Sequence, residues 1–286
     1  MTTDNSSILL IGESGVGKTH YGAQLLKRLM KGDGLLRMDG AASNLEPFEA
    51  AMESLNEGMS ADHTPTGIYV DSIWPIADKQ NRKAELVWPD YGGEQIKAIS
   101  LTRRIPASWR NRVISTPSWL LLVRLQQTRT SDDIFSRPLH EISGNNEENR
   151  EVQVSDQARL IELLQILLYI RGAISISPLQ SPRLCILLSC WDELGAEALE
   201  ERPAVILKQR LPMLASFLES TWLEPTVLGL SALERTLTNS DRDMEYAARG
   251  PEQFGYIVMS DGQRSTDLTI PIQQLLASNS GKAGRT

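Results

Sequence analysis

The fold is decided by one stretch near the start of the 286-residue chain, Gly12-Glu13-Ser14-Gly15-Val16-Gly17-Lys18-Thr19. An apolar run, Ile8-Leu9-Leu10-Ile11, precedes it, and apolar residues at helical spacing follow it. A glycine-rich turn that ends in Lys-Thr, between a strand and a helix, is the context that a phosphate-binding loop requires. Successive backbone N–H groups of such a loop, with the positive end of the following helix, form a cradle for a polyphosphate. The stretch therefore predicts a protein that binds a nucleoside triphosphate.

The residues of this loop have separate chemical uses. We expect the whole stretch from Gly12 to His20 to contact the nucleotide. The Lys18 ammonium can reach the β- and γ-phosphates and assist catalysis, and the Thr19 hydroxyl can ligate Mg²⁺. The alternative is a glycine-rich turn that binds nothing, but such a turn has no use for the Lys-Thr pair.

The whole chain has the composition of an ordinary globular protein, with 41% hydrophobic and 23% charged residues. Its best apolar stretch, 160–176, is interrupted by polar and charged residues, so no segment offers the roughly 18 uncharged residues of a membrane span. The net charge of −7 disfavours general nucleic-acid binding. Cys185 and Cys190 would face opposite ways on one strand, which disfavours a disulfide. With a start, MTTDNSS, unlike a signal peptide, these features favour the cytoplasm.

Strand and helix patterns alternate along the chain, which is typical of an α/β domain with a mostly parallel central sheet and helices on both faces. Besides the first strand we expect strands at 67–74, 84–88, 118–125, 184–189, 224–230 and 255–259. The polar turn 78–82 would join two of them into an antiparallel hairpin. Helices are expected at 45–58, 157–170, 205–223 with Pro212 as a kink, and 268–276.

The expected organisation is a single domain over residues 1–277. Insertions would lie near 33–64, 126–155 and 235–254, and the tail 278–286 would be disordered. The stretch 95–131 is rich in arginine and lysine and contains no acidic residue. It is either a solvated helix face or a docking surface for an acidic partner or an anionic lipid surface.

Four further segments follow the loop in a fixed order: Pro65-Thr66-Gly67, Asp90-Tyr91-Gly92-Gly93-Glu94-Gln95, Ser189-Cys190-Trp191-Asp192 and Gly229-Leu230-Ser231-Ala232. With them the chain resembles the Ras-like GTPases of the translation-factor-related class, particularly the Arf-like pattern P-T-x-G followed by W-D-x-G-G. In overall layout it is also similar to bacterial GTPases that occur in pairs in conflict and defence gene clusters. The resemblance covers about residues 8–276, with insertions.

The resemblance implies a magnesium site and two switch segments. Thr66 would complete the coordination of Mg²⁺ only while the γ-phosphate is present, and Thr64 competes for this role. Asp90, at a strand end, would hold a water molecule bound to Mg²⁺. The Gly93 N–H would approach the γ-phosphate, because glycine has no side chain in the way. Loss of that phosphate would release both segments.

The resemblance also implies a guanine pocket. Asp192 can accept hydrogen bonds from the guanine N1–H and exocyclic amine, and backbone N–H groups near Ser231 and Ala232 would meet guanine O6. The family's base motif is N-K-x-D, and this chain keeps only the aspartate. Cys190 cannot lie along the base as a lysine stem does, so Trp191 or Leu233 would have to supply that packing.

Hydrolysis would be slow. Glu94 stands where the Ras pattern has the glutamine that orients the attacking water, and Gln95 follows it, so either residue can take that role. We expect Lys18 and Thr66 to contribute to the reaction as well. Faster hydrolysis would need a partner or an arginine of the chain itself, for which the candidates are Arg82, Arg103 and Arg104.

The leading interpretation is a GTP-binding molecular switch whose GTP or GDP state controls an effector or activating protein, for example a second GTPase. A role in bacterial defence is implied only by the looser resemblance. One alternative is a P-loop ATPase in which Asp192 and Glu193 form the Walker B element, serving Mg²⁺ and the water. Another is a nucleotide-binding scaffold that hydrolyses nothing.

Overall fold

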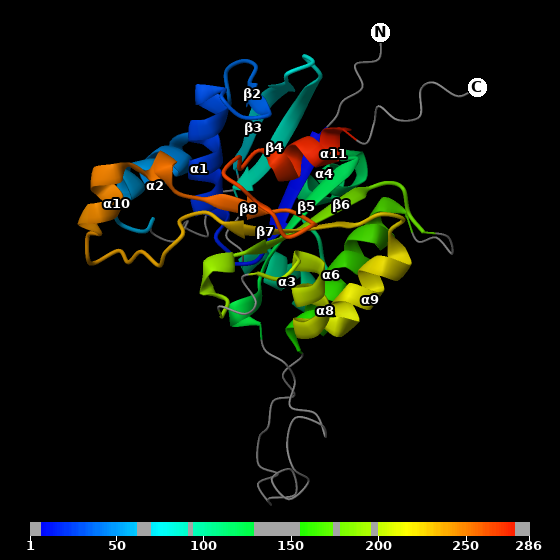
Figure 1. Cartoon of the computed structure of the whole chain (residues 1–286). Helices are drawn as coiled ribbons and strands as arrows, with labels where there is room; N and C mark the ends of the chain where they lie inside the picture. The colour runs from blue at the N-terminus through cyan, green and yellow to red at the C-terminus, as the bar shows by residue number, and fades with distance from the viewer. Residues whose placement is uncertain are drawn as a thin grey trace, which may run out of the picture.

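The computed structural model (Figure 1) describes residues 7–61, 70–90, 94–128, 155–173, 178–195 and 200–277. A nine-stranded sheet of order β2-β3-β4-β1-β5-β6-β7-β8-β9 forms its centre. The strands are β1 (Ser7–Gly12), β2 (Leu36–Met38), β3 (Val70–Asp78), β4 (Lys83–Asp90), β5 (Ser118–Arg124), β6 (Arg183–Ser189), β7 (Thr226–Ser231), β8 (Tyr256–Val258) and β9 (Arg264–Ser265).

The five central strands, β4-β1-β5-β6-β7, run parallel, and the strands at both edges are antiparallel to their neighbours. The predicted fold class is confirmed, and the predicted hairpin is β3 and β4. Among the strands, two were not expected from the sequence, the short strand β2 and the strand β9, which pairs antiparallel with the predicted β8. Both are brief edge strands, which leave little periodicity to detect.

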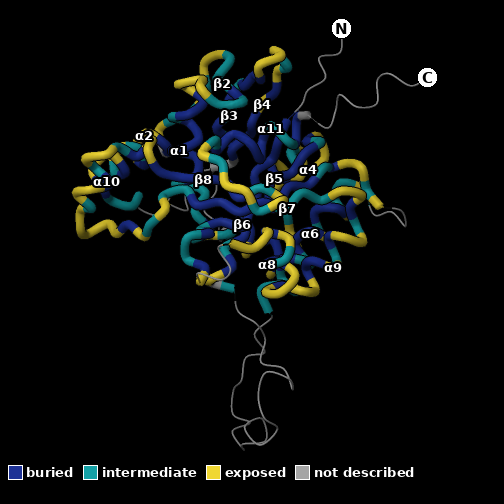
Figure 2. Tube along the Cα trace, viewed as in Figure 1, coloured by how far each residue is buried: buried dark blue, intermediate teal, exposed yellow. Residues whose placement is uncertain are grey.

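Side chains of β1 alternate between two apolar cores, one on each face of the sheet. Leu9 and Ile11 belong to the core that includes residues of α3 (Glu94–Thr102), α4 (Ala107–Ser115), α6 (Asp156–Arg171), α8 (Pro203–Arg210) and α9 (Pro212–Thr221). Ile8 and Leu10 belong to the core that includes residues of α1 (Lys18–Lys31), α2 (Glu46–Asn56) and α11 (Ile270–Ala277). Period-two alternation in a strand covered on both faces explains why every β1 residue is buried. The neighbouring central strands β5 and β6 are buried over most of their length as well (Figure 2).

A third, smaller cluster lies beside the second core. It joins α1 and α2 to α10 (Met244–Arg249) and to the short 3₁₀ helix η3 (Pro251–Gln253), and Tyr246 and Phe254 stack within it with their ring centroids 4.3 Å apart. In Figure 1 the orange α10 lies next to the blue α2. Part of the predicted insertion 235–254 therefore packs against the helix that follows the glycine-rich loop.

The single kinked helix predicted over 205–223 is wrong. The structure has two helices, α8 and α9, which meet at Leu211 with φ −134° and ψ 64°. A proline disfavours helical backbone at the residue before it, so Pro212 ends one helix and begins the next. Of the other predicted insertions, 33–64 contains β2 and α2, whereas 129–154 and the tail 278–286 lie outside the described residues. The single-domain boundary stays a prediction.

Among the helices of the described ranges, none combines the length and the apolar character that crossing a bilayer would take.

Candidate functional site

A pocket of about 440 Å³ opens where the parallel strands end. Its lining comes from the glycine-rich loop and the start of α1, from Ser60 and Ala61, from the last residue of β5, and from the segments that end β6 and β7. In full, the lining residues are Ser14, Gly15, Gly17, Lys18, Thr19, His20, Ser60, Ala61, Arg124, Ser189, Cys190, Asp192, Glu193, Leu230, Ala232, Leu233, Arg235, Thr236, Leu237, Thr238 and Asn239. The volume is in the range of small-molecule and cofactor sites, roughly 300–1,000 Å³.

The glycine-rich loop forms one end of the pocket. Gly15 and Gly17 have φ values of 77° and 80°, the left-handed region that glycine enters without a steric cost. The lysine of the loop is hydrogen-bonded within the loop itself: Lys18 Nζ donates to the carbonyl oxygens of Gly12, at 2.9 Å, and Glu13. Burial lowers the pKa of Lys18 to about 8. An ammonium group held in this way can exchange loop carbonyls for phosphate oxygens.

Not every residue of the loop turns its side chain to the pocket. Val16 is buried in the core, so only its backbone can meet a ligand. The Glu13 carboxylate forms an ion pair with Arg159 of α6, which also pairs with Asp156. Thr19 and His20 line the pocket, and His20 Nε2 accepts a hydrogen bond of 3.1 Å from the Ala61 N–H. His20 therefore links α1 to the segment that leads into residues 62–69.

Asp192 and Ser231 meet at the other end of the pocket. Strands β6 and β7 are parallel neighbours, with Ser189 opposite Leu230, so the residues that follow them emerge side by side. The Ser231 hydroxyl donates to Asp192 Oδ1 at 2.5 Å and accepts from the Glu234 N–H at 2.9 Å. Asp192 and Ala232 line the pocket, whereas Ser231 is fully buried behind them. Ser231 thus orients the carboxylate that was expected to read the base.

Cys190, at the position of the missing lysine, adopts φ 53° and places its thiol at the pocket. Burial raises its pKa to about 12, so it is a neutral thiol there. The idea that Trp191 packs on the base is wrong, because its side chain is fully buried and a Cβ on Gly229 would lie 2.6 Å from its ring. Leu233 does line the pocket, and its packing against a base stays a prediction.

Arg124 is a pocket residue that sequence reasoning did not single out. It ends β5, donates from Nη1 to the Gly15 carbonyl at 3.0 Å, and donates from Nε to Glu193 Oε2 at 2.8 Å. Its Nη2 donates to the other Glu193 oxygen, and these hydrogen bonds raise the pKa of the Arg124 guanidinium. The available signal was a charged residue at the carboxyl end of an otherwise apolar central strand.

Most of the predicted switch residues cannot be placed. Thr66 and Gly93, like Thr64, lie outside the described residues, and the side chains of Asp90 and Glu94 are not described. The backbone of β4 nevertheless ends beside the loop, because β4 pairs in parallel with β1 and Val87 stands opposite Leu9. Both strands therefore end three residues further on, at Asp90 and Gly12. Gln95 is half-buried in α3 and does not line the pocket.

The structure brings none of the three candidate arginines to the pocket lining. Arg82 pairs with Asp78 at the β3–β4 turn, 2.5 Å apart, at the far end of the hairpin from Asp90. Arg103 pairs with Glu162 of α6 at 2.8 Å, and Arg104 is exposed on the segment after α3. The expectation that one of them acts from within the chain is therefore not supported.

The Walker B alternative also fits the geometry poorly. Such an element needs Asp192 to face Mg²⁺ and Glu193 to face a water molecule. Instead the Asp192 carboxylate is bonded to Ser231, and the Glu193 carboxylate is bonded to Arg124.

Within the described ranges, no group of three or more histidine, cysteine, aspartate or glutamate side chains is arranged to hold a metal ion. Mg²⁺ commonly keeps several waters and takes phosphate oxygens with one or two protein ligands. The Thr19 hydroxyl at the pocket fits that kind of site.

Known proteins were found that are similar to this chain. The family model described as Double-GTPase 1 matches residues 9–275. The chain is similar in structure to a bacterial selenocysteine-specific elongation factor, EF-Sec, with 14% identity and a TM-score of 0.39, over 96% of this chain and 29% of that one. It is also similar to the GTP-bound Ski7 GTPase-like domain of S. cerevisiae, with 14% identity and a TM-score of 0.45, over 99% and 51% of the two chains.

A third similar structure is the signal recognition particle receptor SRb-GTP/SRX complex from Chaetomium thermophilum, with 14% identity and a TM-score of 0.38, over 82% and 94% of the chains. The chain thus spans less than a third of the elongation factor and about half of the Ski7 chain. Among curated proteins, no sequence matches it.

Proposed function

The chain belongs to the Double-GTPase 1 family, and on that premise we propose that its GTP-binding GTPase domain works as a molecular switch. The resemblance to P-loop GTPases of the translation-factor-related class is thereby confirmed. The observation that carries the proposal is that one pocket contains both the glycine-rich loop and Asp192. The first suits a polyphosphate, and the second suits a base that offers two hydrogen-bond donors, as guanine does.

In this proposal the loop binds the phosphates and the strand ends complete the magnesium site. Lys18 leaves the Gly12 and Glu13 carbonyls for the β- and γ-phosphates. Thr19 ligates Mg²⁺, and Asp90 holds a water of the ion from the end of β4. Thr66 and Gly93 sense the γ-phosphate, and Glu94 or Gln95 orients the attacking water.

At the base end, Asp192 accepts from the guanine N1–H and amine while Ser231 orients its carboxylate. Backbone N–H groups near Ser231 and Ala232 donate hydrogen bonds to guanine O6. Leu233 supplies the apolar packing against the base. GTP and GDP are thus the expected ligands.

Slow hydrolysis is supported by the state of the two arginines in the described pocket lining. Arg124 is bonded to Glu193 and Gly15, and Arg235 pairs with Asp243 at 2.9 Å and Glu245 at 3.2 Å. Both guanidinium groups are held by these partners, so a fast reaction would draw its stabilising cation from a partner protein. We propose that the partner is an effector or activating protein, such as a second GTPase. The association of paired GTPases with bacterial defence motivates that biological setting.

The test is a binding titration of GTP against ATP with Mg²⁺, repeated for Asp192→Asn with xanthosine triphosphate. Wild type should prefer GTP by about 100-fold, since two charge-assisted hydrogen bonds distinguish the bases. In the variant, an asparagine Oδ1 that keeps the Ser231 bond would turn its amide N–H toward the xanthine C2 carbonyl. Preference should therefore move to the xanthine nucleotide.

Equal affinity of the wild type for GTP and ATP would contradict the guanine pocket, and an unchanged preference in the variant would remove Asp192 from it. A single-turnover assay tests the rate. We expect GTP to persist for minutes with the protein alone, and rapid loss would contradict slow intrinsic hydrolysis.

A further inference from the structure

The turn that carries Asp192 lacks a cation. Its sequence is Cys190-Trp191-Asp192-Glu193, and the residue at the place of the family's lysine is a short neutral thiol. Asp192 would bind the base from a 3₁₀ turn, η2 (Trp191–Glu193), that follows β6. A turn of this length needs outside contacts to hold a carboxylate at a fixed distance from the phosphates.

Arg124 stands between the two parts of the pocket. Strand β5 is hydrogen-bonded to β1 on one side and to β6 on the other, with Leu122 opposite Gly12 and Arg124 opposite Ser189. The end of β5 therefore lies between the strand that leads into the phosphate loop and the strand that leads into η2. From there one guanidinium reaches Gly15 on the first side and both oxygens of Glu193 on the second.

We propose that Arg124 is a positioning residue that ties the base-reading turn to the phosphate loop. The proposal rests on the proposed function of the pocket. A bidentate guanidinium–carboxylate pair fixes Glu193 in orientation as well as distance, and Asp192 is its neighbour in the same turn. The third hydrogen bond holds the Gly15 carbonyl, and the planar peptide bond then fixes the Val16 N–H on the opposite side.

The surroundings of Arg124 suit a fixed link rather than a mobile one. The side chains of Arg124 and Glu193 are 23% and 18% exposed, so solvent screens the pair only partly. All three nitrogens of the guanidinium donate, two of them to the same carboxylate. The group would have to give up Glu193 to act on the γ-phosphate, which is why we assign it to positioning.

The experiment measures GDP and IDP affinity for the full chain and its variants. Inosine lacks the exocyclic amine, so the ratio of the IDP to the GDP dissociation constant reports how well Asp192 is placed. For Arg124→Ala we expect GDP affinity to fall about tenfold and the ratio to fall several-fold, because the variant loses hydrogen bonds between charged groups. Glu193→Gln keeps the Gly15 contact and should lower the ratio without the full loss of affinity.

Arg183→Ala is the matched control. Arg183 is an arginine at the opposite end of β6, where it donates to the Ser118 hydroxyl at 3.0 Å. Its removal should lower the unfolding midpoint and leave the IDP/GDP ratio unchanged. Arg124→Lys can restore the contact with Gly15 but not the bidentate pair, so it should recover GDP affinity more than the ratio.

A wild-type ratio in both Arg124→Ala and Glu193→Gln would overturn the proposal while leaving the guanine pocket intact. A loss confined to kcat, with both affinities unchanged, would overturn it too, because it would place Arg124 at the reacting phosphate. If the wild type itself failed to distinguish GDP from IDP, the proposed function would fail first.

Discussion

The two ends of the pocket are built in different ways. The phosphate end is a single continuous stretch, 12–19, whose shape follows from glycine conformations and the start of a helix. The base end is assembled from segments far apart in the chain, namely the turn after β6, the segment after β7, and Ser60 with Ala61, and Arg124 of β5 bridges it to the loop. A local motif can be recognised from the sequence in full, whereas an assembled wall depends on contacts that only the fold brings together.

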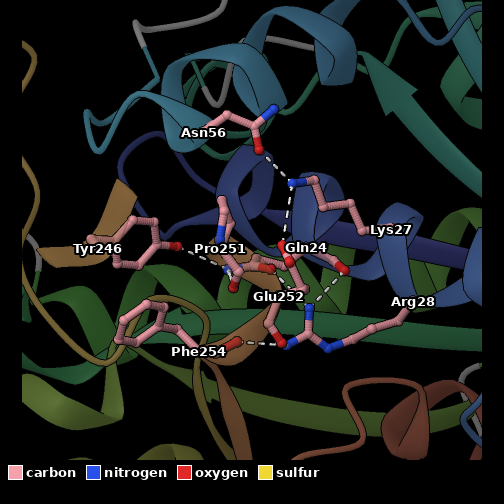
Figure 3. Close-up of polar contacts among 8 residues, drawn as sticks. All are labelled: Gln24, Lys27, Arg28, Asn56, Tyr246, Pro251, Glu252 and Phe254. Atoms are coloured by element: carbon pink, nitrogen blue, oxygen red, sulfur yellow. Dashed lines mark hydrogen bonds and ion pairs between the residues drawn. The ribbon is translucent and has the colours of Figure 1, made fainter. Parts of the chain in front are cut away.

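The base side of the pocket is joined to α1, the helix that follows the phosphate loop, because the lining residue Leu237 packs in one cluster with Ala23 of α1 and with Tyr246 and Phe254. Gln24 donates to the Tyr246 hydroxyl at 3.0 Å and to the Pro251 carbonyl at 2.9 Å (Figure 3). Arg28 is buried and donates to Gln24 Oε1 at 2.8 Å and to the Phe254 carbonyl at 2.5 Å. One helix therefore supports both ends, and substitutions along it can separate them.

The largest effect is expected at the phosphate end, from Lys18→Ala. The variant should lose more than about 100-fold in affinity for GTP and ATP alike, because it removes a cation that contacts the phosphates common to both. Isothermal titration calorimetry measures the loss. Lys27→Ala is the control, since it removes the same charge from α1 at a site bonded to Asn56. Comparable losses in the two variants would show that the loop has no special role.

The next effect is expected from Arg28→Met, which keeps most of the side-chain volume and removes the donors. It leaves the buried Phe254 carbonyl and the Gln24 amide oxygen without their partner, at a cost of about 3 kcal/mol in the free energy of unfolding. Urea denaturation gives the value. Hydrogen exchange should become faster in 244–254 but not in the first turn of α1.

Arg249→Met is the control for that variant. Its guanidinium also contacts Phe254, lying over the ring 4.6 Å from the centroid, but its side chain is 53% exposed. We expect a cost below about 1 kcal/mol from it. Equal costs in the two variants would contradict the view that buried contacts with α1 hold the base-side wall.

The contrast between the ends also explains what the sequence could predict. The glycine-rich loop, the central strands and the place of Asp192 in the pocket lining could be predicted because each has a local pattern: glycine spacing, an apolar run, or an acid after a strand. Arg124 was missed because its importance lies in what it bridges, Gly15 and Glu193, which are far from it in the chain. The prediction that Trp191 packs on the base was wrong because the local sequence does not indicate that Gly229 covers that face of the short turn.

Gly58→Ala tests how the segment after β7, which lines the base end of the pocket, is joined to the segment before residues 62–69. Gly58 has φ 75°, and a Cβ there would lie 2.2 Å from the Asp243 carbonyl oxygen. The Asp243 N–H donates to the Gly58 carbonyl and the Ser60 N–H donates to the Thr238 carbonyl, both at 2.9 Å. The added methyl group should force these two backbone segments apart and break these hydrogen bonds. Because the loss of one or two hydrogen bonds changes a rate by about tenfold, GDP release should become about tenfold faster.

A fluorescent GDP analogue measures that release. Gly172→Ala is the matched control, because Gly172 has φ 69° and no atom within 4 Å of the added Cβ. It carries the same backbone strain, of roughly 1–2 kcal/mol, without the collision. If both variants release GDP at the same rate, the junction between Gly58 and Asp243 does not restrain the nucleotide.

The smallest effect is a pH dependence that belongs to the phosphate end alone. The Lys18 pKa of about 8 lies below the ordinary 10.5, so the ligand-free protein loses this proton as the pH rises through 8. A bound polyphosphate favours the charged form, and GDP affinity should therefore be level below pH 8 and fall by up to about tenfold per pH unit above it.

The stability of the ligand-free protein should change in the opposite direction. Between pH 8 and 10.5 the unfolded chain binds more protons at Lys18 than the folded chain, so this group's contribution to the free energy of unfolding rises with pH. Asp192→Asn should keep the same slope of affinity, because it alters only the base end, and a flat affinity between pH 7 and about 9 would show that Lys18 does not titrate against the phosphates.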